Sequence, residues 1–364
     1  MVHSDHRSRG QDTAPPTGFP EAFTNSFRGM LLGALLGDVR NPGSAVVHSG
    51  PVIPQLCWTV DALIRHRLHT RARDPGLTPG HDAQPPPPTP HIRRGLQHWG
   101  AVTRGWPGCT KAQGWLAHVP ALGIDRGPTL AEDSAQADLM ARRTLSRSDF
   151  RTSSMLFRTL PVAASAIVAG PDVVSGWCAS ATGLTHGHPE AWTAAALLGI
   201  LVGSHLTEVF RSGPFARIDP LATIDWFFGD LPASPMEDAL SPALTTGHWS
   251  PAILAALSRD DSPSSVLAGA LYLFEHFRTE RPSTVRELAA TAGSPHAVAS
   301  LASALIGLER GPGGLDTTEL SRHELSWVVD SLARDYCVTL WSPPVQHGEM
   351  DVLEEMTLRY PKED

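Results

Sequence analysis

The chain alternates between apolar segments with helical spacing and short polar segments rich in glycine and proline. One of the longest apolar runs, residues 194–203, has no helix-breaking residue before Gly199. Pro189 is compatible with the first turn of a helix, because the N–H groups there have no intrahelical acceptor. Glu190 places a negative charge at the positive end of the helix dipole. The pattern predicts a buried helix that begins at the polar turn 183–188.

A second apolar segment, residues 23–38, carries Gly29, Gly33 and Gly37 at intervals of four positions. Residues four apart lie on one face of a helix, and glycine on that face lets a neighbouring helix approach closely. The spacing predicts a tightly packed helix that ends near Asp38.

Helical spacing recurs along the rest of the chain. Residues 51–54 are expected to be irregular, and residues 150–158 are expected to form a polar loop. The sequence shows no alternating pattern of the kind that indicates β-strands. Helical segments joined by loops predict an all-α fold. The further helices are expected near residues 55–67, 91–104, 131–142, 159–169, 191–207, 220–228, 264–277, 284–292, 297–308 and 322–333.

The predicted organisation is a single compact domain over residues 21–340. Residues 1–20 are polar and lack an apolar core, so they are expected to be a disordered tail and not a signal peptide. Residues 69–90 include four consecutive prolines and are expected to form a surface insertion, or alternatively a docking site for a proline-recognising domain. Residues 341–364 form a C-terminal extension.

Composition narrows the possible functions. The 364 residues carry a net charge of -8 and no run of basic residues, so nucleic-acid binding is not expected. The apolar runs 160–170 and 194–203 are shorter than the roughly 20 residues that a membrane-spanning helix needs. The four cysteines show no metal-binding spacing and are expected to be free thiols. These features predict a soluble, cytoplasmic protein.

The order of the motifs resembles the ADP-ribosylglycohydrolase family over about residues 23–335. Residues 27–38 resemble its opening RGxLLGxxxGD helix, and residues 185–191 match its THxHPxA motif. The resemblance implies an all-α domain that binds ADP-ribose and hydrolyses an ADP-ribosyl bond with two magnesium ions. Further segments that resemble family motifs in the same order are residues 58–65, 114–116, 126–129, 153–162, 266–272 and 285–288.

The chain departs from the family at the metal-binding motifs. The family holds its magnesium ions through carboxylates, and the ions orient the ribose and activate a water. The corresponding residues 50–53 and 293–298 contain no carboxylate, and the glutamate expected after Asp38 falls near Ala45. We therefore expect no paired magnesium site and no cofactor.

Six residues are candidate ligand contacts on the basis of the resemblance: Ser153, Ser154, Met155, Arg158, His186 and His188. The first three stand where the family wraps a diphosphate with a glycine-rich loop, and backbone N–H groups there could still bind an anion. Arg158 would either contact a phosphate or form a buried pair with a carboxylate. No acid–base pair is visible around Asp38 or Asp61, so no catalytic residue is assigned.

The two histidines leave three alternatives open. They could hydrogen-bond the start of the helix, contact a ligand, or join His296 in a transition-metal site. His186 is the better ligand candidate, because the resemblance places it near the bound ADP-ribose.

Three functional hypotheses follow. The first is a pseudoenzyme that binds an ADP-ribosyl group or related nucleotide. The second is a metal-independent hydrolase of an N- or O-glycosidic bond in the same pocket. The third is a structural protein that binds a protein partner and has a closed pocket.

Overall fold

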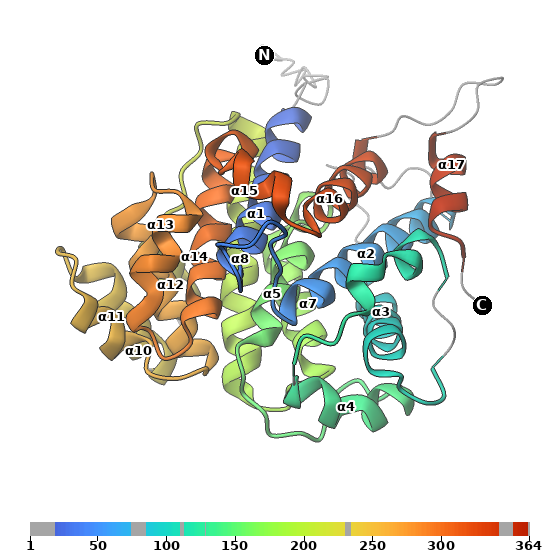
Figure 1. The fold of residues 1–364 in the computed structure, drawn as a ribbon, viewed down its shortest axis with the longest axis horizontal. Coiled ribbons are helices and arrows are strands. Elements are labelled where there is room, and N and C mark those ends of the chain that lie inside the picture. The colour runs from blue at the N-terminus through green and yellow to red at the C-terminus, as the bar shows by residue number, and fades with distance from the viewer. Residues whose placement is uncertain are drawn as a thin grey trace, which may run out of the picture.

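The structure is a computed structural model that describes residues 19–73, 85–109, 113–127, 129–229, 234–341 and 352–362. These residues form a helical assembly, in which the only extended pairings are the isolated bridges Val39–Ser49 and Val47–His323 (Figure 1). The predicted all-α fold is confirmed. Most of the expected N-terminal tail, and parts of the expected insertion and C-terminal extension, lie outside the described residues.

The helices follow one another as α1 (Pro20–Gly37), α2 (Val52–Arg73), α3 (Thr89–Trp99), α4 (Leu130–Met140), α5 (Ser154–Ala163), α6 (Ala166–Ala169), α7 (Pro171–Gly183), α8 (Pro189–Ser212), α9 (Pro220–Phe228), α10 (Pro235–Thr245), α11 (Pro251–Leu257), α12 (Pro263–Phe277), α13 (Pro282–Leu288), α14 (Pro295–Arg310), α15 (Thr317–Arg322), α16 (Ser326–Trp341) and α17 (Val352–Arg359). Short π- or 3-10 helices are η1 (Gly100–Arg104), η2 (Trp115–His118), η3 (Pro120–Gly123), η4 (Ala289–Thr291) and η5 (Pro312–Gly314).

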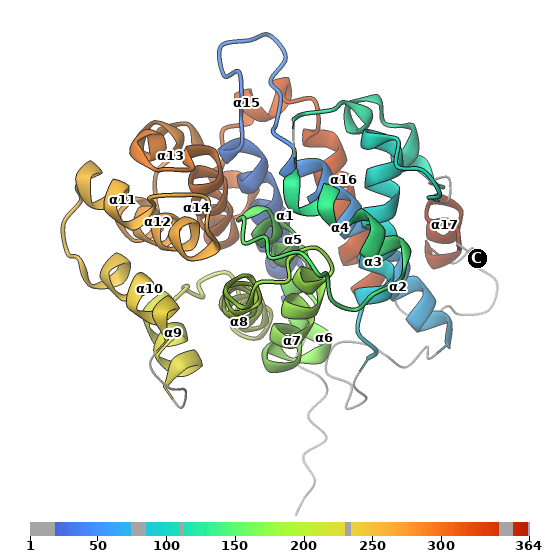
Figure 2. The same ribbon diagram turned by 90° about the horizontal axis from the view of Figure 1, so that it is seen from below.

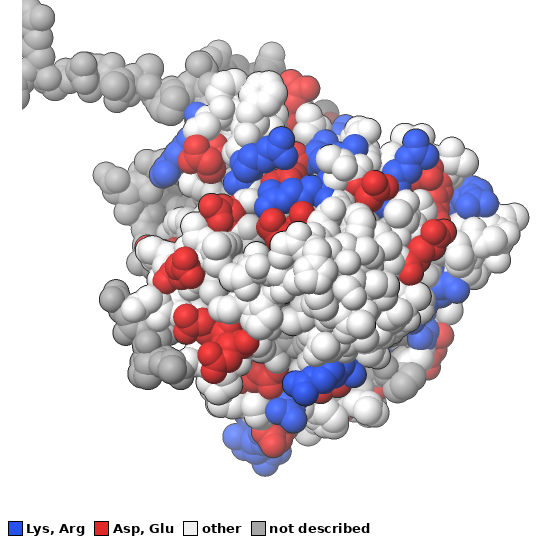
Figure 3. Space-filling view, turned by 90° about the vertical axis from the view of Figure 1, so that its left-hand side faces the viewer, with Lys and Arg blue, Asp and Glu red and all other residues white. Residues whose placement is uncertain are grey.

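The centre of the molecule consists of α1, α5 and α8. Helices α9–α13 lie on one side of this centre, and α2–α4 with α17 lie on the other (Figure 2). On the side of α10–α13, uncharged residues cover a wide area, and basic residues occur in small groups near acidic ones (Figure 3). This face therefore lacks the continuous basic surface that nucleic-acid binding requires.

The glycine face of α1 packs directly on α14. A Cβ atom added at Gly29 would lie 2.1 Å from the carbonyl oxygen of Gly307, and one at Gly33 would lie 2.2 Å from that of Ser303. Glycine is needed at both positions, because any side chain would overlap the backbone of α14. The predicted close helix contact is confirmed, and α1 ends at Gly37 with Asp38 as its cap.

Helix α8 begins at Pro189 as predicted and continues through Gly199 to Ser212. At Gly199 an added Cβ would lie 2.7 Å from Sγ of Cys178 on α7, so glycine here allows α7 and α8 to pack closely. The 24-residue helix is long and apolar enough to cross a bilayer by composition, but 67% of its most apolar window is buried within the structure. That burial is typical of the central helix of a folded core.

Several predicted boundaries are wrong. Residues 51–54 are not irregular, since α2 begins at Val52; Pro54 falls in its first turn, where a missing N–H costs little. The expected insertion 69–90 is shorter, because α2 continues to Arg73 and α3 begins at Thr89. The polar segment 150–158 is a loop only as far as Ser153, after which α5 begins.

The expected helix 159–169 is divided in two. Helix α5 ends at Ala163 and α6 covers Ala166–Ala169. Near the C-terminus, the expected helix 322–333 is displaced, because α15 ends at Arg322 and α16 begins at Ser326. Helix α7 was not predicted, although Pro171 provides its first-turn signal.

The residues that follow α17 contact α2 and α16. The hydroxyl of Tyr360 donates to Oδ2 of Asp335 on α16 at 2.5 Å, and Arg65 on α2 donates to the carbonyl of Pro361 at 2.5 Å. Arg65 also pairs with Asp61 at 2.6 Å, so this buried carboxylate is engaged away from the candidate site.

Candidate functional site

A cavity of about 360 Å³ lies where α1, α2, α4, α5 and α14 converge. Its walls join the start of α2 to the starts of α5 and α14, segments that are far apart in the sequence. The lining residues include Asp38, Arg40, Pro51, Val52, Thr129, Leu130, Glu132, Thr152, Ser153, Ser154, Phe157, Asp261, Ser294, Pro295, His296 and Ala297.

Two consecutive serines at the start of α5 each hold a carboxylate. The hydroxyl of Ser153 donates to Oδ1 of Asp261 at 2.6 Å, and Ser294 donates to the same oxygen at 3.0 Å. The hydroxyl of Ser154 donates to Oε1 of Glu132 at 2.9 Å. The cavity is therefore bordered by two fixed carboxylates that come from α4 and from the segment before α12.

Glu132 is buried with its charge opposed by one arginine. Nη1 of Arg158 lies 3.3 Å from Oε1 of Glu132, and both side chains are 1% exposed. Burial raises the pKa of Glu132, and the nearby Arg158 opposes that rise. Its second oxygen, Oε2, has no hydrogen-bond partner among the described residues. A buried polar atom without a partner is costly, so Oε2 lowers the stability of this site unless a water reaches it.

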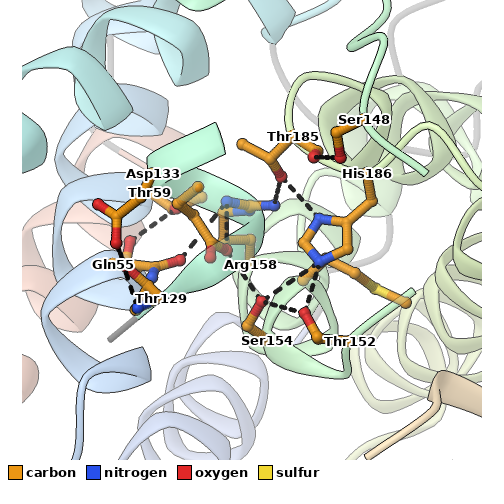
Figure 4. A network of polar contacts seen from close by, with 12 residues as sticks. Gln55, Thr59, Thr129, Asp133, Ser148, Thr152, Ser154, Arg158, Thr185 and His186 are labelled. Carbon is orange, nitrogen blue, oxygen red and sulfur yellow. Dashed lines mark hydrogen bonds and ion pairs between the residues drawn. The ribbon is translucent and has the colours of Figure 1, made fainter. Parts of the chain in front are cut away.

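Both ring nitrogens of His186 make polar contacts (Figure 4). Arg158 donates to Oγ1 of Thr185, and the same oxygen lies 2.8 Å from Nδ1 of His186. Nε2 of His186 lies 2.9 Å from Oγ1 of Thr152. Burial lowers the pKa of His186 well below its usual range, which favours the neutral ring.

The same network continues to Glu132. The hydroxyls of Thr152 and Ser154 lie 3.3 Å apart, and Ser154 donates to Glu132. Arg158 contacts both Glu132 and Thr185, so the polar contacts form a closed ring that begins and ends at Arg158. The ring fixes the orientation of the hydroxyls that face the cavity.

The six candidate residues lie in different environments in the structure. Ser153 and Ser154 line the cavity. Met155 is fully buried, and His186 lies behind Thr152 and Ser154 with no exposed surface. The two remaining candidates have structural contacts: Arg158 forms the buried carboxylate pair that was one of its two alternatives, and His188 caps α8 by accepting the backbone N–H of Glu190.

Two residues of the site, Glu132 and Asp261, were missed in the sequence. A signal existed for Glu132, because it lies three and seven positions before the buried Ala135 and Leu139, on the inner face of α4. A carboxylate on the buried face of a helix indicates a specific partner. Asp261 lies in a polar loop segment, where its sequence context gives no such signal.

The residues at the expected metal positions do not fit a paired magnesium centre. Pro51, Val52 and Pro295, which stand where the resemblance places the metal-binding motifs, line the cavity without offering a side-chain oxygen. Asp38 reaches the cavity, but it accepts hydrogen bonds from Arg40 at 2.9 Å and from the N–H of Gly50 at 2.8 Å. Within the described ranges, no group of three His, Cys, Asp or Glu side chains could hold a metal ion. His186, His188 and His296, which were one of the alternatives, therefore do not form such a group.

Comparison with known proteins agrees with these motifs. A family model for ADP-ribosylglycohydrolase matches residues 55–342. No curated protein matches the chain. A solved structure named ADP-ribosylglycohydrolase-related protein complex is similar with a TM-score of 0.57 and 18% identity, over 88% of this chain and 100% of that chain. At that identity the structural likeness shows the fold alone.

Proposed function

The chain belongs to the ADP-ribosylglycohydrolase family, and on this premise we propose that it binds an ADP-ribosyl group or a related nucleotide without magnesium-dependent hydrolysis. One observation carries the proposal: Pro51, Val52 and Pro295, which stand where the resemblance places the metal-binding motifs, line an open cavity together with Ser153 and Ser154. Magnesium requires oxygen ligands, and the side chains of the two prolines and the valine offer none.

The cavity is open enough to accept a ligand. Its volume of about 360 Å³ falls within the range of roughly 300–1,000 Å³ that is usual for small-molecule sites. The proline and valine side chains line it without filling it, which counts against the closed-pocket hypothesis. The hydroxyls of Ser153 and Ser154 supply polar groups that would orient the hydroxyls of a sugar.

A second candidate function is hydrolysis of a glycosidic bond without metal. Such reactions use one protonated carboxyl as the acid and one ionised carboxylate as the base or nucleophile. Glu132 and Asp261 are two of the carboxyl groups that border the cavity. In the reaction, water would add across the bond between the anomeric carbon and its leaving group: the hydroxyl would go to the anomeric carbon and the proton to the leaving group.

Calorimetric titration with ADP-ribose tests the first proposal. We expect saturable binding with the same affinity with and without magnesium, and no release of ADP-ribose from ADP-ribosylated arginine or serine peptides. Magnesium-dependent turnover would contradict the proposal.

The same peptides separate the two candidates. Turnover in the presence of a chelator would favour the metal-independent hydrolase, and Glu132→Gln and Asp261→Asn would then each reduce it by roughly 100-fold or more. The matched control is Asp238→Asn on the exposed surface of α10, which should not change it.

A further inference from the structure

A second cavity, of about 630 Å³, adjoins the first. The two share Arg40, Pro295 and His296, which therefore form a dividing wall. The second cavity extends away from α5 and is bounded by α13, α15 and the segment after α1. No residue of the network around His186 lines it.

Two arginines of this cavity retain free donors. Arg40 uses one terminal nitrogen to bind Asp38, and its side chain is 40% exposed. Arg322 is exposed and donates only to the carbonyls of Pro42 at 3.3 Å and Ser44 at 3.4 Å, without an ion pair to any described carboxylate. Both guanidinium groups can form further hydrogen bonds.

Two of the carboxylates in the same walls are already engaged. Glu319 makes a bidentate pair with Arg286 at 2.6 and 3.0 Å. Asp316 caps α15 by accepting the N–H groups of Thr318 and Glu319. Glu287 also lines the cavity and is exposed to solvent.

His296 in the dividing wall is half-buried. Burial lowers its pKa most, and the charges of Arg40 and Arg286 lower it further. A neutral imidazole carries no charge, but it can donate one hydrogen bond to an anion bound beside the two arginines.

We propose that Arg40 and Arg322 form a binding site for a phosphate group in the second cavity, beside His296. Planar guanidinium groups bind phosphate oxygens in pairs, and a tetrahedral phosphate has enough oxygens to accept from two arginines in different walls. The remaining volume can hold the body of a phosphate ester. This site is separate from the Ser153–Ser154 wall, so it does not depend on the function proposed above.

Calorimetric titration at low ionic strength with inorganic phosphate, phenyl phosphate and benzoate tests the site. We expect phosphate binding that weakens about 10-fold in Arg322→Gln and in Arg40→Gln, since each loses charge-assisted hydrogen bonds. Arg40→Lys, which keeps the charge without the planar fork, should be intermediate. The matched control is Arg310→Gln, because Arg310 is also exposed and donates to two carbonyls, those of Thr279 and Glu280.

Tighter binding of phenyl phosphate than of inorganic phosphate identifies an ester as the ligand, and equal affinity identifies free phosphate. Preferential binding of benzoate, or equal weakening by Arg310→Gln, overturns the proposal. A measurement on the unaltered chain guards against misfolded variants: phosphate should shift the NMR signals of the His296 ring, identified by their loss in His296→Gln. Saturable binding without that shift also overturns it.

Discussion

The hydroxyl of Ser153 lies 2.6 Å from Oδ1 of Asp261, although 108 positions separate the two residues. This hydrogen bond connects the start of α5 to the segment before α12 across the wall of the candidate site. Ser153→Ala should lower the free energy of unfolding by about 1.5–3 kcal/mol, the usual contribution of a hydrogen bond to a charged group. Urea denaturation measures it. A smaller loss is expected for Asp261→Asn, which keeps the accepting oxygen, and the reverse order would contradict the assignment.

The buried pair of Arg158 and Glu132 makes a second prediction. Arg158→Met leaves the Glu132 carboxylate buried without its cation and should cost about 3–5 kcal/mol. Glu132→Gln removes the charge that Arg158 opposes and should also destabilise the fold. The double variant should lose less than the sum of the two, because neither charge is then left alone. Additive losses in urea denaturation would show that the two side chains do not interact.

The contact between α1 and α14 predicts an unusually severe effect of one methyl group. In Gly33→Ala the new Cβ would meet the backbone of Ser303, which cannot move aside as a side chain can. The expected loss is about 3 kcal/mol or more. Gly43→Ala is the control, because no atom lies within 4 Å of a Cβ placed there. Equal urea midpoints for the two variants would refute the close packing.

The buried Asp38 predicts a particular pH dependence. Burial raises its pKa from 3.8 to about 6 despite Arg40, so the folded protein holds this proton more tightly than the unfolded chain. The contribution of Asp38 to stability is therefore complete below pH 4 and lost as the pH rises through 6. Relative to Asp38→Asn, which does not titrate, the unaltered chain should lose about 2–3 kcal/mol between pH 4 and pH 7. A constant difference across that range would contradict the raised pKa.

Pro51, Val52 and Pro295 stand where the metal-binding motifs are expected. Their presence predicts that magnesium does not change the stability of the protein. Millimolar magnesium should leave the melting temperature unchanged, because a ligand stabilises a fold only when it binds the folded state. Calorimetry should find no saturable binding. A stoichiometry near two would mean that other oxygens form the expected centre after all.

The helical pattern of the sequence predicts a helix well where distinctive residues define one face or one end of that helix. The glycines of α1 and the proline and glutamate at the start of α8 each have a local physical meaning, so both helices begin or end where expected. Prolines were misleading at Pro54, because a proline in a first helical turn has the same sequence signature as one that breaks a helix.

The candidate site was harder to predict, because its geometry depends on contacts between distant segments. The resemblance located Ser153 and Ser154, but nothing near them in sequence indicates that Glu132 and Asp261 are their partners. Similarly, His186 stands in a preserved motif, yet its position behind the cavity wall follows from the packing of α5 against α8.

The pairing of α1 with α14 also has a consequence for biosynthesis. The hydroxyl of Ser300 binds the carbonyl of Ala34, 266 positions earlier. At roughly 5–20 residues per second, the first helix leaves the ribosome some tens of seconds before the partner that covers its glycine face. During that interval the glycine face of α1 has no helix to cover it, so a newly made chain exposes this face until α14 has been synthesised.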